Sequence, residues 1–187
     1  MPKISFTTVI IAFAISGCAT ISNRNGLSDV GIDGVACVGT VISNVAGLSE
    51  SNNASLLPKV QLQTDKGGVC SAKVFSVIAP VVLYRVFDSS KPYTKFGGWW
   101  SLNRPAGSKE EYRAANAICQ EWSPLDKLVS CEIRPGSQIV IGTTQSTICN
   151  DGSVYPKTAE NQVFVANDAR SGFVHVGACS EEMIWNQ

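Results

Sequence analysis

Arg85 is the charged residue of an otherwise apolar stretch, Val81–Phe87, with the sequence V-V-L-Y-R-V-F. Burying an unpaired charge costs several kcal/mol, so an arginine here must point to solvent, be paired or face a site. If the stretch is a strand, Tyr84 and Val86 share one face and Arg85 lies on the other. The pattern therefore leaves two interpretations open: a solvent-facing arginine, or one that holds an anionic group.

Trp99 and Trp100 are adjacent tryptophans in a segment, 88–106, that has neither a helical nor a strand period. Gly97 and Gly98 precede them, and glycines let a backbone turn where bulky residues cannot. Aromatic faces stack on many ring-containing ligands, although they also anchor long loops to a core. We therefore predict that a small molecule or a protein partner binds at this Trp99-Trp100 loop.

Few other residues are typical of a known catalytic site. The stretch from Gly142 to Ser146 reads G-T-T-Q-S, a predicted polar turn that either presents amide and hydroxyl groups to a ligand or only connects two strands. His175 is the single histidine and alternates with two valines, which favours a surface position. A Cys-His site or a Ser-His-Asp triad therefore has little support.

The order of three motifs resembles the ADP-ribosyltransferase superfamily and its toxin-type NAD glycohydrolase relatives. These motifs are Y-R-V around Arg85, T-T-Q-S at 143–146, and A-E-N-Q-V-F-V at 159–165. The resemblance implies that Arg85 holds a phosphate or the ribose of NAD, and that Thr143, Thr144 and Ser146 stand near the Ser/Thr motif of the family. Glu160-Asn161-Gln162 would fall at its acidic motif.

The resemblance also implies which activity to expect. Gln162 occupies the second acidic position, where transferases use a carboxylate on the ribose, so NAD binding or glycohydrolysis is implied rather than protein modification. In that case Trp99 or Trp100 would stack on nicotinamide, and Gln145 or Gln162 would orient the reacting ribose. NAD would then be a substrate, and the sequence indicates no other cofactor.

The elements that must position these residues are mostly strands. Alternating or β-branched runs bounded by turn residues predict strands at 34–43, 60–64, 69–78, 81–87, 128–133, 138–141, 162–166 and 173–176. One helix is expected over about 108–122, because Ser108 and Glu111 form a capping-box pattern and Pro124 disfavours helix at the residue before it. The predicted fold class is α+β, with a mainly antiparallel sheet.

The cysteines predict a disulfide framework. Apart from Cys18 there are six, an even number typical of exported domains: Cys37, Cys70, Cys119, Cys131, Cys149 and Cys179. Six cysteines allow fifteen pairings, and the sequence does not choose among them. A single histidine and the lack of a C-x-x-C motif argue against a metal site.

The first residues are typical of a targeting segment, with Lys3 before a short apolar run, 4–16. The tetrapeptide I-S-G-C at 15–18 resembles the lipobox of bacterial lipoproteins, which implies cleavage after residue 17 and lipidation of Cys18. In a host with two membranes, Ala19 after the cysteine implies the outer one. We therefore expect a lipid-anchored protein of the cell envelope that is attached to the membrane rather than spanning it.

The remaining chain has the composition of one globular domain. Hydrophobic residues make up 44% and charged residues 16% of the sequence. We expect a flexible tether over 18–33 and a single disulfide-linked domain over 34–187. Lys plus Arg and Asp plus Glu number 15 each, which provides no electrostatic footprint for nucleic acid. A third hypothesis, beside ligand binding and NAD glycohydrolysis, is a structural or immunity-type lipoprotein that binds another protein through an exposed face.

Overall fold

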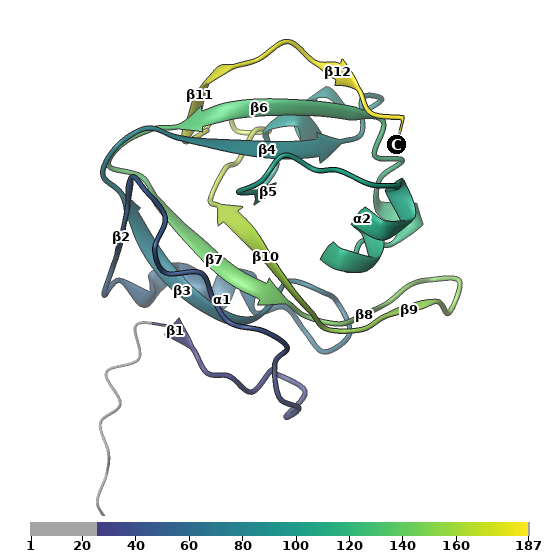
Figure 1. The fold of residues 1–187 in the computed structure, drawn as a ribbon. Coiled ribbons are helices and arrows are strands. Elements are labelled where there is room, and N and C mark those ends of the chain that lie inside the picture. The colour runs from purple at the N-terminus through teal and green to yellow at the C-terminus, as the bar shows by residue number, and fades with distance from the viewer. Residues whose placement is uncertain (1–25, 187) are drawn as a thin grey trace, which may run out of the picture.

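The computed structural model describes residues 26–186, and a strongly curved antiparallel sheet forms its framework (Figure 1). Its strands are hydrogen-bonded in the order β1-β3-β7-β10-β5-β4-β6-β11, while β2 pairs with β3 and β12 with β6. Their bounds are β1 Gly26–Leu27, β2 Leu48–Glu50, β3 Val69–Val77, β4 Val81–Phe87, β5 Trp99–Ser101, β6 Lys127–Ile133, β7 Gln138–Thr144, β10 Thr158–Val165, β11 Val176–Cys179 and β12 Met183–Ile184. A separate hairpin joins β8, Thr147–Ile148, to β9, Val154–Tyr155.

The main core lies on the side of the sheet that receives every second residue of β3, β4, β6 and β7. Val81, Leu83 and Phe87 of β4 pack there with residues such as Phe75 and Ile141. The opposite side carries smaller clusters, one of which contains Val86 and Leu128. This alternation confirms the predicted strands at 69–78, 81–87, 128–133, 138–141 and 162–166, each within a few residues at its ends.

Helices are few and short. The main one, α2, covers Lys109–Asn116 and lies beside the open end of the curved sheet, near the β8–β9 hairpin (Figure 1). The predicted capping box is present: the Ser108 side chain accepts from the Glu111 amide, and the Glu111 carboxylate accepts from the Ser108 amide. The shorter helical segments are η1 Ala54–Leu56, α1 Leu57–Val60, η2 Pro92–Phe96 and η3 Gln120–Trp122.

The predicted helix over 108–122 is therefore too long. Helix α2 ends at Asn116 because Ala117 adopts a left-handed conformation with φ of 49°. The guanidinium of Arg113 then donates to the carbonyls of Cys119 and Ser123, at 3.1 and 2.6 Å. These side-chain bonds hold the chain after α2 in a turn followed by the short 3-10 helix η3, and the apolar spacing of the sequence does not reveal them.

Three further element predictions were wrong. Residues 34–43 form no strand, since Gly34 and Gly39 both have φ of 76°, which interrupts extended backbone. Residues 60–64 form no strand: Val60 is the last residue of α1, Leu57–Val60, which has Pro58 near its start, where proline is favoured. The last expected strand, 173–176, is displaced, because β11 begins only at Val176.

The Trp99-Trp100 segment was also expected to be a loop, but it forms strand β5. This short strand lies between β10 and β4, with Trp100 opposite Val163 of β10 and Ser101 opposite Tyr84 of β4. A strand of three residues is too short to show a period, and it follows Gly97, Gly98 and the proline of η2, which are typical of a loop.

Residues 26–36 lie against the domain, which differs from the flexible tether expected over 18–33. Strand β1 pairs with β3, with Leu27 opposite Ala72. The Asp33 carboxylate pairs with Lys157 at 2.8 Å, and the Lys157 ammonium also bonds to the Val35 carbonyl at 2.7 Å. The predicted leader 1–17, the lipidation site Cys18 and residues 19–25 lie outside the described residues.

The six cysteines beyond Cys18 form three disulfides, as the even count predicted. The bridges are Cys37–Cys70, Cys119–Cys149 and Cys131–Cys179, which span 33, 30 and 48 positions of sequence. The first ties the N-terminal segment to β3, the second ties the turn after α2 to the β8–β9 hairpin, and the third joins β6 to β11. Within residues 26–186, no helix has both the length and the apolar character required to cross a bilayer.

Candidate functional site

A cleft of about 200 Å³ opens beside the three adjacent strands β10, β5 and β4. Each of these strands contributes one residue that sequence analysis selected: Gln162, Trp99 and Arg85. The remaining walls come from the loop 62–68, from η2 and from the segment that follows α2. Residues that are up to 77 positions apart in sequence therefore line one cleft because their strands are neighbours in the sheet.

Arg85 is partly buried and lines this cleft. Its Nε donates to the Thr94 carbonyl at 2.6 Å, and its Nη1 donates to the Trp99 carbonyl. The close approach of the guanidinium requires glycine at 97, because a Cβ there would overlap Nη2. The arrangement corrects the interpretation of Arg85 as a solvent-facing residue, since Arg85 fastens η2 and β5 onto β4.

The charge of Arg85 has no acidic partner within 4 Å among residues 26–186. Burial lowers the pKa of its guanidinium to about 10, so the group remains a cation at neutral pH. A desolvated cation bonded only to neutral carbonyls is electrostatically uncompensated. Asp88 also lines the cleft, but its carboxylate is paired with Lys91 at 3.0 Å, so Arg85 is left to favour an anionic group there.

Trp99 and Trp100 face opposite sides of β5. The Trp99 ring packs edge-on against Phe164, with ring centroids 5.2 Å apart, and lines the cleft. Trp100 is 2% exposed in the main core, and its Nε1 donates to the Gly97 carbonyl at 2.8 Å. One tryptophan of the pair is therefore available to a ligand, and the other is a core residue.

Gln162 is held in one orientation by two hydrogen bonds. Its Nε2 donates to the Asn116 carbonyl at 3.0 Å and to Thr144 Oγ1 at 2.9 Å, and Thr144 Oγ1 in turn donates to the Glu160 carbonyl at 3.1 Å. Because Nε2 carries both bonds, Oε1 is left as the acceptor of this amide. Asn116, which also lines the cleft, had no signal in the sequence, because the predicted helix ran past it to about residue 122, whereas α2 ends there.

Gln145, the other glutamine predicted to act on a ribose, does not line the cleft. It is 1% exposed, and its Oε1 accepts from the Ser146 amide at 3.0 Å. Its Nε2 lies under Gly31, where a Cβ would be 2.9 Å away, and has no hydrogen-bond partner among the described residues. The side chain supports the N-terminal segment, and Gln162 remains the glutamine beside Arg85.

A second hollow, of about 420 Å³, lies on the other side of Asn116 and is lined by Glu160, Tyr112 and Arg104. Burial raises the pKa of the Glu160 carboxyl above its usual value. Burial also raises the pKa of the Tyr112 phenol, which shares a 3.2 Å hydrogen bond with Ser101. Glu160 thus lies close to the cleft but in a neighbouring hollow.

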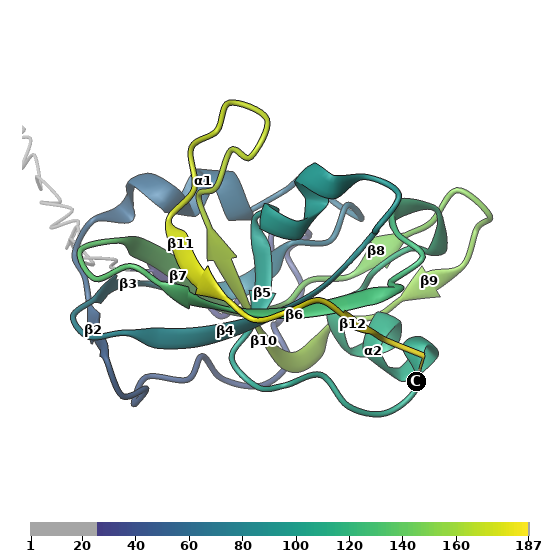
Figure 2. The same ribbon diagram turned by 90° about the horizontal axis from the view of Figure 1, so that it is seen from above.

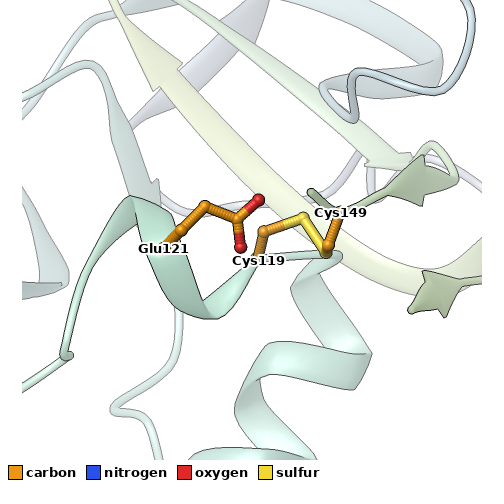
Figure 3. Close-up of side chains that lie close together, drawn as sticks. All are labelled: Cys119, Glu121 and Cys149. Carbon is orange, nitrogen blue, oxygen red and sulfur yellow. A yellow bond between two sulfur atoms is a disulfide. The ribbon is translucent and has the colours of Figure 1, made fainter. Parts of the chain in front are cut away.

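Figure 3 shows Cys119, Glu121 and Cys149, whose potential ligand atoms lie within 4.8 Å of one another. The two sulfur atoms are joined in a disulfide, and metals bind the thiolate form of cysteine. The Glu121 carboxylate accepts from the Asn150 amide at 2.9 Å. In this oxidised state the group therefore offers one carboxylate and links η3 to the β8–β9 hairpin.

Comparisons with known proteins identify no family. No family model matches the chain, and no curated protein matches it. Among solved structures, a chain from "Structure of Tne2 in complex with Tni2" is similar with a TM-score of 0.43 and 13% identity. The match covers 67% of this chain and 98% of that one. A likeness this distant carries no information about activity.

Proposed function

We propose that the protein binds a small ligand that carries a ring and an anionic group in the cleft between Arg85, Trp99 and Gln162. The convergence of these three residues from three adjacent strands is the observation that carries the proposal. Ligand sites typically combine an apolar or aromatic wall with a few fixed polar groups.

Each residue has a distinct role under this proposal. The half-buried Trp99 ring provides a face for stacking, held at its angle by Phe164. Arg85 attracts the anionic group, because its cation is desolvated and lacks an acidic partner among the described residues. Gln162 accepts a hydrogen bond from a hydroxyl or amine of the ligand through Oε1.

NAD is the candidate ligand, and its glycohydrolysis is the second candidate function. Arg85, Trp99 and Gln162 are the residues to which the family resemblance gives roles toward phosphate, nicotinamide and ribose. In this reaction the oxygen of water bonds to the ribose carbon as the bond from that carbon to nicotinamide breaks. Nicotinamide leaves with the electron pair of that bond, and one proton of the water passes to solvent. Gln162 would accept a hydrogen bond from a ribose hydroxyl and so orient the reacting carbon.

The test measures NAD binding by calorimetry, and nicotinamide release, with the oxidised full chain in detergent. Arg85→Lys keeps a cation near the Thr94 and Trp99 carbonyls but loses the planar fork, so we expect NAD affinity to fall at least tenfold. Gln162→Met keeps the volume but removes the acceptor, so we expect release to fall more than binding. Arg104→Lys, which lies outside the cleft, is the matched control and should change neither.

The outcomes separate the two candidates. NAD binding without release supports a binding protein and rejects glycohydrolysis. If neither NAD, ADP-ribose nor nicotinamide binds at millimolar concentration, the nucleotide ligand is rejected. Equal losses in Arg85→Lys and Arg104→Lys would show that the Arg85 guanidinium in the cleft does not determine the affinity.

We also propose that a lipid on Cys18 attaches this domain to the envelope membrane, with Ala19 directing it to the outer membrane. The lipobox-like sequence I-S-G-C supports this proposal. Cys18→Ser should abolish the incorporation of labelled palmitate into the protein and should release the protein from the membrane fraction. Unchanged palmitate incorporation in the variant would reject it.

A further inference from the structure

A hollow of about 210 Å³ adjoins the cleft, and both share Arg85 and Thr94 among their lining residues. Its other walls come from η2 and from the loop 167–170, which follows β10 and rises above the sheet in Figure 2. Segment η2 passes over Arg85, because Thr94 accepts the bond from its Nε. The guanidinium therefore lies at the junction of two hollows.

A second arginine lines this hollow. The Arg170 guanidinium lies over the Tyr93 ring, with Cζ 4.5 Å from the ring centroid, and its side chain is exposed. Neither Arg170 nor Arg85 forms an ion pair within 4 Å in the part of the chain that the structure describes. Two arginines that form no ion pair within 4 Å in this part of the chain thus line the same small concavity.

The other polar groups of the hollow are already engaged. The Asp168 carboxylate accepts from the Ser171 hydroxyl at 2.6 Å and from the Ser171 amide at 3.2 Å, which commits it to its own turn. Asn167 donates to the Gly97 carbonyl at 3.3 Å and accepts from the His175 amide at 2.7 Å. With two cations and one committed carboxylate, the hollow has an excess of positive charge and of N–H donors.

We propose that this hollow binds a phosphate or diphosphate group of the ligand between Arg85 and Arg170. Guanidinium groups bind phosphate oxygens through paired N–H donors, and Arg170 is already oriented by its stacking on Tyr93. The inference rests on the proposed function for the ring of the ligand, which lies on the Trp99 side of Arg85. The ligand class is therefore an elongated one, a ring-bearing compound whose phosphates extend past Arg85 under η2.

Calorimetry with inorganic pyrophosphate in low-salt buffer tests the phosphate site, with the oxidised full chain in detergent. We expect Arg170→Gln to weaken pyrophosphate binding at least tenfold. Arg134→Gln, which removes the same charge from a position outside the hollow, is the matched control and should change it less than twofold. Because Arg170 is exposed, its substitution should leave the urea midpoint unchanged.

Failure of this inference is distinguishable from failure of the proposed function. Equal weakening by Arg170→Gln and Arg134→Gln, or no pyrophosphate binding at millimolar concentration, would overturn the phosphate site while NAD binding is measured separately. If NAD binds but Arg170→Gln leaves its affinity unchanged, the phosphate site is overturned and the cleft stands. Arg170-dependent pyrophosphate binding without NAD binding supports the phosphate site and rejects NAD.

Discussion

Lys157 holds the N-terminal segment around Asp33, between β1 and the Cys37–Cys70 disulfide, and replacing this lysine with methionine should loosen that part of the segment. The Lys157 side chain is 8% exposed and that of Asp33 is 18% exposed, and the ammonium bonds to both Asp33 and the Val35 carbonyl. Breaking a buried pair from one side costs about 3–5 kcal/mol. Since Asp33 keeps some contact with water, we expect a smaller loss than this, about 2–3 kcal/mol.

This loss should appear as local opening rather than global unfolding. The amide of Gly34 donates to the Gly31 carbonyl at 3.0 Å, and that of Cys37 donates to the Asp29 carbonyl at 2.8 Å. Their hydrogen exchange reports opening of the segment. At 1.36 kcal/mol per tenfold, Lys157→Met should speed their exchange by about 30- to 150-fold.

The pH dependence has a defined sign. The hydrogen bond from Lys157 holds the pKa of the Asp33 carboxyl below its usual value. The stability from this pair is therefore present above the unfolded pKa of aspartate, about 4, and is lost as the pH falls through the lower, folded pKa. Protection of the Gly34 amide in the native protein should fall over that acidic range, and in Lys157→Met it should not.

The matched control is Lys73→Met, whose pair with Glu50 is exposed by about 40% on both sides. Exposed pairs contribute at most about 1 kcal/mol, so exchange at Gly34 should change less than about fivefold. A change below threefold in Lys157→Met, or equal changes in the two variants, would refute the account of the segment as held by a buried ion pair.

Three other predictions concern the domain itself. Replacing Cys119 and Cys149 with alanine should lower the free energy of unfolding by about 3.5 kcal/mol in urea titrations, because a loop of 30 positions is no longer closed; an unchanged midpoint would contradict this. Trp100→Ala should lower the free energy of unfolding by about 3–5 kcal/mol, because it truncates a core side chain. Trp99→Ala should lower it clearly less and should mainly weaken ligand binding; equal losses of stability would show that both tryptophans are core residues. Glu160→Gln should raise the free energy of unfolding more at pH 7 than at pH 4. The pKa of Glu160 is raised in the folded protein, so ionisation of this carboxyl above its unfolded pKa disfavours folding. A difference in stability that does not change with pH would contradict the raised pKa.

The sequence was most informative where one physical signal dominated. The apolar runs at 69–78 and 81–87 predicted β3 and β4, and the Ser108–Glu111 pattern predicted the start of α2. An even cysteine count predicted full pairing among the six. In the first two cases neighbouring residues determine the outcome, through alternation and helix capping, and in the third the even cysteine count does.

What could not be predicted depends on contacts between distant segments. Strand β5 exists because β10 and β4 supply partners on both sides, and three residues show no period of their own. The left-handed Ala117 that ends α2 is held by bonds from Arg113 to later carbonyls. Residues 26–33 have the composition of a linker, yet Lys157, more than 120 positions away, holds them in place.

The candidate site shows the same division. Arg85 was predicted because a charge within an apolar strand is visible in sequence, and Gln162 because of its motif. The exclusion of Gln145 and the inclusion of Asn116 required the register of β7 and β10 and the end of α2. Which face of β5 each tryptophan occupies likewise followed only from its strand pairing.

Because the N-terminal segment pairs with the sheet from β1 onwards, it limits the distance between a lipid on Cys18 and the domain. With β1 beginning at Gly26, eight residue steps separate the proposed lipid site at Cys18 from the sheet. A fully extended chain covers at most about 3.6 Å per step, so that span is at most about 29 Å. A tether ending at residue 33 would have allowed roughly twice that distance. The domain would thus work within about one protein diameter of the bilayer and meet ligands and partners close to that surface.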